Sequence, residues 1–577
     1  MKTFKYSFLL ILVFLISCED VLDIKPIDRI AENVIWDDPV MVQAYVTNLY
    51  TRFPYDAFNQ GGWYCWTDEG TTSTGNSSIV TLGSINRNNE AAGYWNYTYI
   101  RDCNIFLERI ASAEIDQNIK KQLEGEVRFI RAYAYFEKMK RYGGVPLVDV
   151  VIDPFKPIDD KYLVRAKEEE IANFIDRECT VAVALLSDGT TPRGKINKWT
   201  ALALQARANL WAASIAKFST VELNGIVGIP SANANIFYKK ASDAANAVII
   251  SGKYSLYNAI PSNKEDNFRN IFVTESNDEL IFIRPYDGIN FGHNWDAMMA
   301  PNQWSVRGGM GNPTLDFILR FENADGSVDA PVFGPNALYD EGRGPFKNKD
   351  PRLFATVFFE GDAWGNGKVQ TYEGLDPSIN PTPSAIIRNP MLNHEGVRTS
   401  GLDSRSQTKD DYSTNSGFLI KKYVENVIIG IPENQSKTNW IVFRLAEMYL
   451  TKAEADFEMG NLQDAAIAIN ATRLRAGISL VNQANITREI IRTERSSELA
   501  FEVHRYWDLR RWRTAADVLN RTFRGLQIIL HFPTGKYYFI PFNCETFSRV
   551  FRPEHYYNPI TTSRINNNPK LIENPLY

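Results

Sequence analysis

Three glutamates, Glu494, Glu498 and Glu502, recur every four residues near the C-terminus. A glycoside hydrolase needs two carboxyl groups about 5–10 Å apart, one on either side of the bond that it cleaves. Residues four apart on a helix share a face, so this spacing could supply such a pair. Opposite charges are interleaved with the glutamates, at Arg495, Arg505 and Asp508. That mixture favours an ion-paired helix over a catalytic pair, and we predict a structural role for the three glutamates.

Other motifs for catalysis or metal binding are missing from the sequence. It contains no GxSxG nucleophile motif and no phosphate-binding loop. The five histidines form no HExxH or HxxxH pair, and the five cysteines form no CxxC pair. We therefore predict no catalytic residue, no metal and no cofactor. The sequence leaves open whether four of the cysteines form disulfides: Cys65, Cys103, Cys179 and Cys544.

The charge balance argues against a nucleic-acid partner. The 577 residues carry a formal net charge of −5, and the densest basic stretch is the short run 510–513. Nucleic-acid binding proteins need clustered Lys and Arg side chains to neutralise phosphates. A hydrophobic fraction of 44% is typical of a folded globular chain. We predict a globular protein that does not bind nucleic acid.

Sugar binding requires a different set of side chains. Pyranose rings expose C–H faces that stack on indole or phenol rings, and their hydroxyl groups pair with Asp, Asn and Arg side chains. Loop aromatics close to such groups are the candidates: Trp63, Tyr64 and Trp66 with Asp68, Arg87 and Asn88, and Trp295, Trp304 and Trp364 from the middle of the chain. For any single tryptophan, packing in the core is the more frequent role. Five others fall on predicted helices and are assigned to the core: Trp95, Trp199, Trp440, Trp507 and Trp512.

The elements that must position these residues are mostly helical. Hydrophobic periodicity predicts helices over residues 38–50, 95–110, 118–141, 199–218, 238–251, 440–459 and 462–475. The last two meet at Gly460-Asn461 as a hairpin of about 34 residues, which resembles a tetratricopeptide unit. Plain helical hairpins in an irregular globule are an equal alternative. We predict a mostly α fold of tetratricopeptide-like hairpins packed against an irregular, loop-rich region with few short strands.

The loop-rich region lies in the middle of the chain. Residues 256–438 are rich in Gly, Pro, Asn and Asp, and their one clear strand covers residues 279–283. Irregular insertions on a rigid scaffold commonly carry binding sites. Residues 31–577 are therefore predicted to form a single domain, with a helical scaffold over 31–255 and 439–577 and a ligand-binding insertion between them.

The N-terminus has the pattern of an exported lipoprotein. Lys2 and Lys5 precede a short apolar run that ends in Leu15-Ile16-Ser17-Cys18, a lipobox-like sequence. We predict a signal peptide over residues 1–17, an acylated Cys18, and a tether over 18–30. An ordinary secretory signal with a chance cysteine is the alternative. No later segment is apolar over the length of a membrane-spanning helix.

Several motifs, taken in order, resemble the SusD/RagB family of outer-membrane nutrient-binding lipoproteins. They are EVRFIRAYAYF (126–136), YGGVPL (142–147), DPRL (350–353), WIVFRLAEMYL (440–450), NATRLRAG (470–477) and ERSSELAFE (494–502). The short leader after Cys18 and the tail over residues 566–577 are similar as well. One departure is Val503, where the family often has glycine.

The resemblance implies a function that composition and spacing do not. It implies capture of an oligosaccharide or polysaccharide, or of a peptide in some members, by a lipid-anchored protein facing the cell exterior. It implies a partner, a TonB-dependent outer-membrane barrel of the SusC type that receives the ligand. The alternatives are a lipid-anchored, all-helical glycan-active enzyme and a scaffold that only joins proteins.

Overall fold

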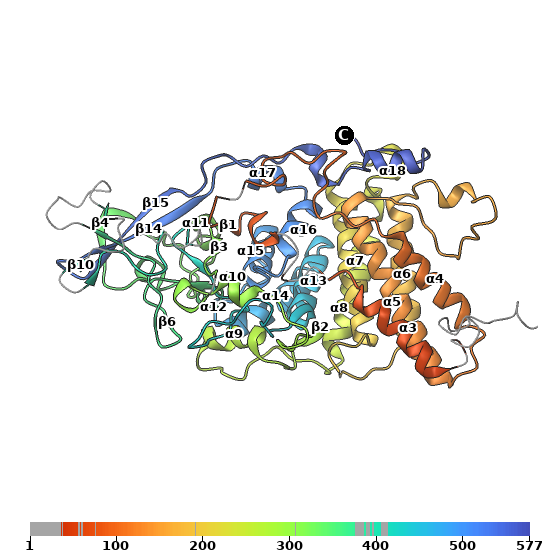
Figure 1. Cartoon of the computed structure of the whole chain (residues 1–577), viewed down its shortest axis with the longest axis horizontal. Helices are drawn as coiled ribbons and strands as arrows, with labels where there is room; N and C mark the ends of the chain where they lie inside the picture. The colour runs from red at the N-terminus through yellow and green to blue at the C-terminus, as the bar shows by residue number, and fades with distance from the viewer. Residues whose placement is uncertain are drawn as a thin grey trace, which may run out of the picture.

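The computed structural model describes residues 36, 38–55, 58, 62–75, 77–190, 192–305, 307–375, 386–387, 393–394, 397–405 and 413–577. The predicted signal peptide, Cys18 and the tether lie outside the described residues. Figure 1 shows an elongated molecule with helices gathered at one end and a strand-rich region at the other. The prediction of a mostly helical chain with few short strands is confirmed.

Most of the long helices form one stacked array, although a long insertion interrupts its sequence. Its members are α5 (Gln117–Tyr142), α6 (Glu168–Leu185), α7 (Lys198–Phe218), α8 (Ala234–Ile250), α13 (Leu445–Glu458) and α14 (Leu462–Ala476). Each helix packs on the next in this order, including α8 on α13 across the insertion (Figure 1). The array is therefore continuous in space where the sequence is not.

Local sequence explains how the array is built. The Asp116 carboxylate caps the first turn of α5 by accepting from the backbone N–H groups of Asn118 and Ile119. Gly143, with a φ of 75°, ends the helix in a conformation that is costly for other residues. Inside α5, a Cβ on Gly125 would lie 2.7 Å from Leu186 Cγ, so only glycine lets α6 approach this closely. Buried alanines along α7 and α8 serve the same purpose.

The remaining helices flank this array or lie near the strands. They are α3 (Pro39–Thr51), α4 (Tyr97–Arg109), α9 (Lys264–Val273), α10 (Trp295–Met299), α11 (Leu315–Ile318), α12 (Pro351–Thr356), α15 (Arg488–Glu498), α16 (His504–Arg511), α17 (Ala515–Leu519) and α18 (Thr562–Asn567). Asp38 caps α3, because its carboxylate accepts from the backbone N–H of Val40 at 2.8 Å. The last helix, α18, is short and lies close to the C-terminus.

The strand-rich end is built around one five-stranded sheet in the order β4-β15-β14-β8-β9. Its hairpin, β14 (Arg524–His531) with β15 (Lys536–Asn543), comes from the C-terminal part of the chain, which was predicted as helical scaffold. The other three strands come from the predicted insertion: β4 (Gly334–Tyr339), β8 (Glu373–Leu375) and β9 (Ile386–Ile387). The insertion and the C-terminal segment thus share a sheet.

Short paired strands connect the remaining loops. They are β1 (Gly70–Thr72) with β3 (Gly311–Pro313), β2 (Leu280–Arg284) with β13 (Trp440–Arg444), β5 (Val357–Phe358) with β12 (Leu419–Ile420), β6 (Ala363–Trp364) with β7 (Gly367–Lys368), and β10 (Asn393–His394) with β11 (Val397–Arg398). The predicted strand at 279–283 is confirmed as β2.

Two predicted helical segments are wrong in part. Residues 440–444 were predicted to begin a helix, but they form β13, and the helix α13 starts only at Leu445. Pairing with β2 explains the difference, since a tertiary partner overrides local propensity. Glu502 was predicted to share a helix face with Glu494 and Glu498, but α15 ends at Glu498 and Glu502 lies in the following turn.

A buried network of charged side chains joins the array to the strand-rich end. Its cations are Arg352, Lys422, Arg444, Arg473 and Arg475, and its anions are Glu279, Asp350, Glu494, Glu498 and Glu502. Glu498 lies at its centre, with salt bridges to Arg352 (2.8 Å), Arg444 (2.6 Å) and Arg475. Burial opposes ionisation of Glu498, but the arginines outweigh it and hold its pKa well below the usual range. The predicted ion pairing of the three glutamates is confirmed.

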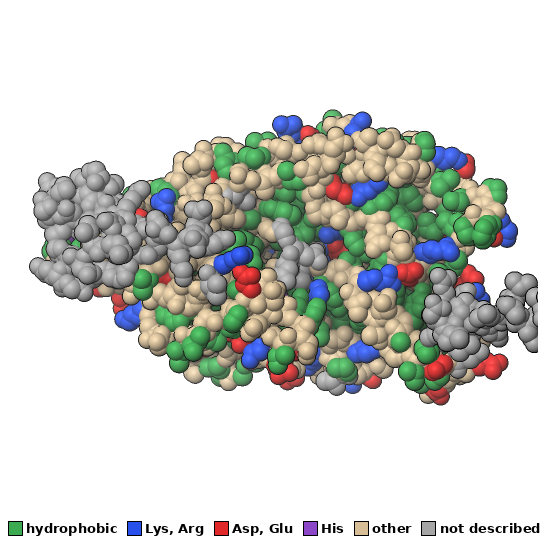
Figure 2. All heavy atoms as spheres, viewed as in Figure 1, with side chains coloured by type: hydrophobic (Ala, Val, Ile, Leu, Met, Phe, Trp, Pro, Cys, Tyr) green, Lys and Arg blue, Asp and Glu red, His purple; other side chains and the backbone are tan. Residues whose placement is uncertain are grey.

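The described residues show neither a metal site nor a membrane-spanning helix. The four cysteines whose pairing the sequence left open are buried, and Cys103, Cys179 and Cys544 form no disulfide among the described residues. Among the described residues, no cluster of His, Cys, Asp and Glu could hold a metal ion, and no helix is long and apolar enough to cross a bilayer. Figure 2 shows acidic and basic side chains scattered over one face, with no large area of a single sign.

Replacing Glu498 with glutamine should lower the free energy of unfolding by about 3–5 kcal/mol, because three buried guanidinium groups would lose their shared counter-ion. Urea unfolding at neutral pH would measure it. Glu489→Gln, at an exposed position of the same helix, is the matched control and should change stability by less than about 0.5 kcal/mol. If the two variants were equally stable, the Glu498 salt bridges would not contribute to the free energy of unfolding, and the prediction would be wrong.

Candidate functional site

The first predicted aromatic cluster is folded against the C-terminal part of the chain. Trp63 lies in the short 3-10 helix η1 (Trp63–Cys65) and is only 6% exposed. Its ring centroid lies 4.9 Å from that of Trp66, 5.0 Å from Tyr506 and 5.7 Å from Trp507. Tyr64 and Trp66 are partly exposed. The cluster therefore presents part of Trp66 to solvent while Trp63 holds it in place.

The acidic residues beside this cluster are buried and paired. Asp68 accepts from Arg505 at 3.0 and 2.8 Å and from Arg320. Burial works against its charge, but the two guanidinium groups hold the pKa of Asp68 below its usual range. Glu69 accepts from the backbone N–H of Phe501 at 3.1 Å, and burial raises its pKa to about 7. Both carboxyl groups anchor the loop to the 500–505 turn.

The three tryptophans predicted from the middle of the chain are also buried. The indole N–H of Trp295 donates to the backbone carbonyl of Lys422 at 2.9 Å, and that of Trp304 donates to Asn366 at 3.1 Å. Trp364 packs under the guanidinium of Arg269. Ligand binding by these buried tryptophans and by Trp63 stays a prediction.

The structure brings the two predicted aromatic sets together at one point. The rings of Tyr64 and Trp295 meet edge to face with centroids 6.1 Å apart. The exposed pair predicted with them, Arg87 and Asn88, lies apart from this contact, beside the C-terminal segment. Arg87 donates to the backbone carbonyl of Tyr577 at 2.7 Å, and Asn88 accepts from Thr562 at 3.3 Å. Trp364 packs instead edge to face on Phe358, with ring centroids 4.6 Å apart.

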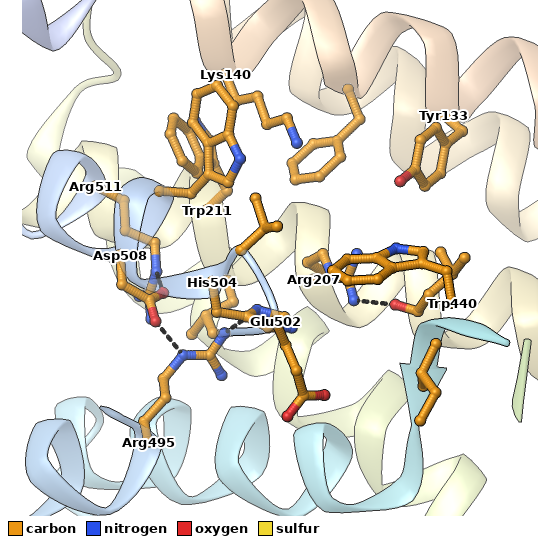
Figure 3. A pocket seen from close by; sticks show the side chains of 16 residues that line it. Tyr133, Lys140, Arg207, Trp211, Trp440, Arg495, Glu502, His504, Asp508 and Arg511 are labelled. Carbon is orange, nitrogen blue, oxygen red and sulfur yellow. Dashed lines mark hydrogen bonds and ion pairs between the residues drawn. The ribbon is translucent and has the colours of Figure 1, made fainter. Parts of the chain in front are cut away.

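An internal cavity of about 60 Å³ lies between three of the family-like motifs, residues 126–136, 440–450 and 494–502 (Figure 3). Val503 lines it, as do Trp211, Trp440, Trp507 and several charged residues. The charged residues are paired: Arg207 donates to Glu447 and to the backbone carbonyl of Val442, both at 2.6 Å, and Arg495 donates to Asp508 at 2.8 Å. A cavity of this size holds a few waters and cannot hold a sugar ring.

Burial also removes the histidine of this cavity from acid–base chemistry near neutral pH. The pKa of His504 is held well below its usual range by burial and then by the neighbouring Arg207 and Arg495. Figure 3 shows His504 beside Arg495 and Glu502, and its Nδ1 lies 3.2 Å from an Arg495 guanidinium nitrogen. We interpret the cavity as a packing junction between the array and the 502–511 segment.

A larger concave surface lies at the helical end, and sequence reasoning missed it. This groove of about 700 Å³ runs between the start of α4, the extended segment 146–158 and α18. Its aromatic residues are Trp95, Tyr97 and Tyr162, all partly exposed. Trp95 and Trp507 were predicted to lie in the core, but both are only partly buried. Trp199, Trp440 and Trp512 are buried as predicted. The signal that could have found the groove is the WNY run directly before a helix.

Comparisons with known proteins match almost the whole chain. A family model described as "SusD family" matches residues 278–577, and one described as "Starch-binding associating with outer membrane" matches residues 22–210. The SusD-like protein P25 of Formosa agariphila is 24% identical, and the match covers 99% of this chain and 98% of that protein. A SusD-like protein of Bacteroides ovatus is 21% identical, covering 98% and 94%.

Solved structures show the same fold. A SusD-like protein from Bacteroides fragilis superposes with a TM-score of 0.73 at 25% identity, over 96% of this chain and all of that one. A second protein from the same species, described as a SusD-like carbohydrate binding protein, gives a TM-score of 0.68 at 22% identity, over 93% of this chain and all of that one.

The raised pKa of Glu69 predicts a pH-dependent stability. Between pH 4.5 and about 7 the unfolded chain releases this proton and the folded chain keeps it, so stability should fall as pH rises through that window, by about 3 kcal/mol from this group. Glu69→Gln should remove this part of the fall, measured by urea unfolding at pH 5 and pH 8. Glu275→Gln, at an exposed position, is the control. An unchanged pH dependence in Glu69→Gln would contradict the shift.

Proposed function

Because the chain belongs to the SusD family, we propose that it is a lipid-anchored binding protein of the outer membrane that faces the cell exterior. In this proposal it captures an oligosaccharide or polysaccharide and passes it to a TonB-dependent barrel of the SusC type. Two comparisons support a glycan as the ligand. One is the family model described as "Starch-binding associating with outer membrane", and the other is the Bacteroides fragilis structure described as a SusD-like carbohydrate binding protein.

One observation favours binding over catalysis. The glutamates whose spacing could have served a glycosidase are buried and held by arginines: Glu494 by Arg352 at 2.6 Å, and Glu498 by three guanidinium groups. A glycosidase acid must reach the glycosidic oxygen of its substrate, and these carboxylates face inward. We propose that the protein binds its ligand without changing it.

For the contact with the ligand we propose the predicted residues that keep exposed surface. Trp66 offers part of an indole ring, and Arg87 and Asn88 offer planar hydrogen-bonding groups on the loop that follows. Tight anchoring beneath them, through Trp63 and Asp68, would keep this surface rigid and lower the entropy cost of binding.

Affinity electrophoresis against a panel of polysaccharides would test the binding. The chain from Glu19 onward keeps every described residue and should be retarded by one class of glycan, which should be recovered uncleaved. Trp66→Ala and Arg87→Ala should each weaken binding by about 1–3 kcal/mol. Tyr449→Ala, a partly exposed aromatic on α13, is the control. Retardation by casein peptides alone, or cleavage of the glycan, would contradict the proposal.

The lipid anchor can be tested separately. Cells expressing the full chain should incorporate a labelled fatty acid into the wild type, because acylation of Cys18 would retain the protein at the membrane. Cys18→Ala should carry no label and should be released into the soluble fraction. Absence of label on the wild type, or equal label on both, would contradict the anchor.

A further inference from the structure

The groove at the helical end has the shape of a second binding site. Its volume of about 700 Å³ falls within the range of ligand-binding clefts, about 300–1,000 Å³. Figure 1 shows its two helical walls, α4 and α18, at the end of the molecule away from the five-stranded sheet. Two walls come from opposite ends of the chain, and Arg564 of α18 forms a salt bridge to Glu90 that holds them together.

The aromatic residues of the groove are fixed in place before any ligand arrives. The Tyr97 hydroxyl donates to the backbone carbonyl of Pro146 at 2.7 Å, and its ring centroid lies 5.5 Å from that of Trp95. The guanidinium of Arg564 lies 4.8 Å from the Trp95 ring centroid. Tyr162 adds a third, partly exposed ring. Rigid, half-exposed rings of this kind suit the C–H faces of sugars.

Polar side chains stand beside these rings. The amide of Asn567 is exposed and makes no hydrogen bond to the described residues, and Asn568 uses its amide nitrogen to hold the backbone carbonyl of Leu163 at 2.7 Å. Thr98 adds an exposed hydroxyl. Planar amides and hydroxyl groups next to aromatic rings can pair with sugar hydroxyls.

Arg101 of the groove has no acidic partner among the described residues. It donates from Nη1 to the backbone carbonyl of Ile152 at 2.8 Å, and the residue is exposed. No acidic residue is among the described residues that line the groove, and the other arginine there is neutralised by Glu90. An exposed guanidinium held in a fixed orientation is suited to a carboxylate or a sulfate ester, which it can bind through two parallel hydrogen bonds.

We propose that this groove binds an oligosaccharide that carries an anionic group, with Arg101 contacting the anion and Trp95, Tyr97 and Tyr162 contacting the sugar rings. The inference rests on the proposed function and adds a contact area whose lining residues do not include Arg87 and Asn88. It narrows the ligand class to acidic glycans, whose charge comes from a uronate carboxylate or a sulfate ester.

Isothermal titration calorimetry would test the groove with three sets of oligosaccharides: uronate-containing, sulfated and neutral. Arg101→Gln keeps a donor for the Ile152 carbonyl and removes the charge, so it should weaken binding of one acidic set by about tenfold and leave neutral binding unchanged. Asn567→Ala should weaken the same set. Arg177→Gln, at an exposed position of α6, is the matched control. The set that responds identifies the anion.

The outcomes separate this inference from the function on which it rests. Wild-type binding of an acidic glycan that Arg101→Gln and Asn567→Ala leave unchanged, with thermal midpoints unaltered, would overturn the groove and keep the proposed function. Binding of neutral glycans alone would overturn the groove in the same way. Failure of the wild type to bind any of the three sets would overturn both.

Discussion

The buried charge network is the constraint on which the rest of the structure depends. Removing one member of a buried ion pair costs several kcal/mol of stability, because it leaves the partner as a buried charge without a counter-ion. Arg444 shows how this acts on the fold: one guanidinium contacts Glu279 before β2, Glu498 at the end of α15 and Glu502 in the following turn. Glu279 and Arg444 are far apart in sequence from each other and from the two glutamates. The network can therefore form only when these segments have folded against one another.

The network also explains how the interrupted helical array is completed. The chain leaves the array after α8 and returns at β13, which pairs with β2 and places Arg444 directly before α13. Because Arg444 is fixed by its carboxylate partners, α13 starts at a defined position and can pack on α8. The insertion is thereby closed at its base, and its loops are held on a rigid body, which is the arrangement a binding surface needs.

Sequence patterns predicted the positions of the helices far better than the burial and packing partners of individual side chains. Helix caps such as Asp38 and Gly143 act over a few residues, so they can be read locally. The burial of Trp63 cannot, since its ring packs on Tyr506 and Trp507, more than four hundred residues away. The β14–β15 hairpin was missed although its strands are rich in Ile, Leu, Phe and Tyr and flank a Pro-Thr-Gly turn. Its other sheet partners lie in the insertion, far away in sequence. The groove was missed because Trp95 was assigned to the core from its position near a predicted helix. Its contact with Arg564 of α18, close to the other end of the chain, cannot be inferred from local sequence.

The same network accounts for the residue at which the chain departs from its family. Val503 has a φ of 68°, a left-handed conformation that costs a residue with a Cβ about 1–2 kcal/mol and that suits the glycine expected here from the family resemblance. Before Val503, Lys422 donates to the carbonyl of Ala500 at 2.8 Å and to Glu502 at 2.7 Å, and Glu69 accepts from the N–H of Phe501. After it, Arg505 donates to Asp68 at 3.0 and 2.8 Å. Ionic and hydrogen bonds thus hold the residues on either side of Val503, so its conformation is imposed from outside the residue. Strain of this size is tolerated because the groups that impose it would lose more by relaxing.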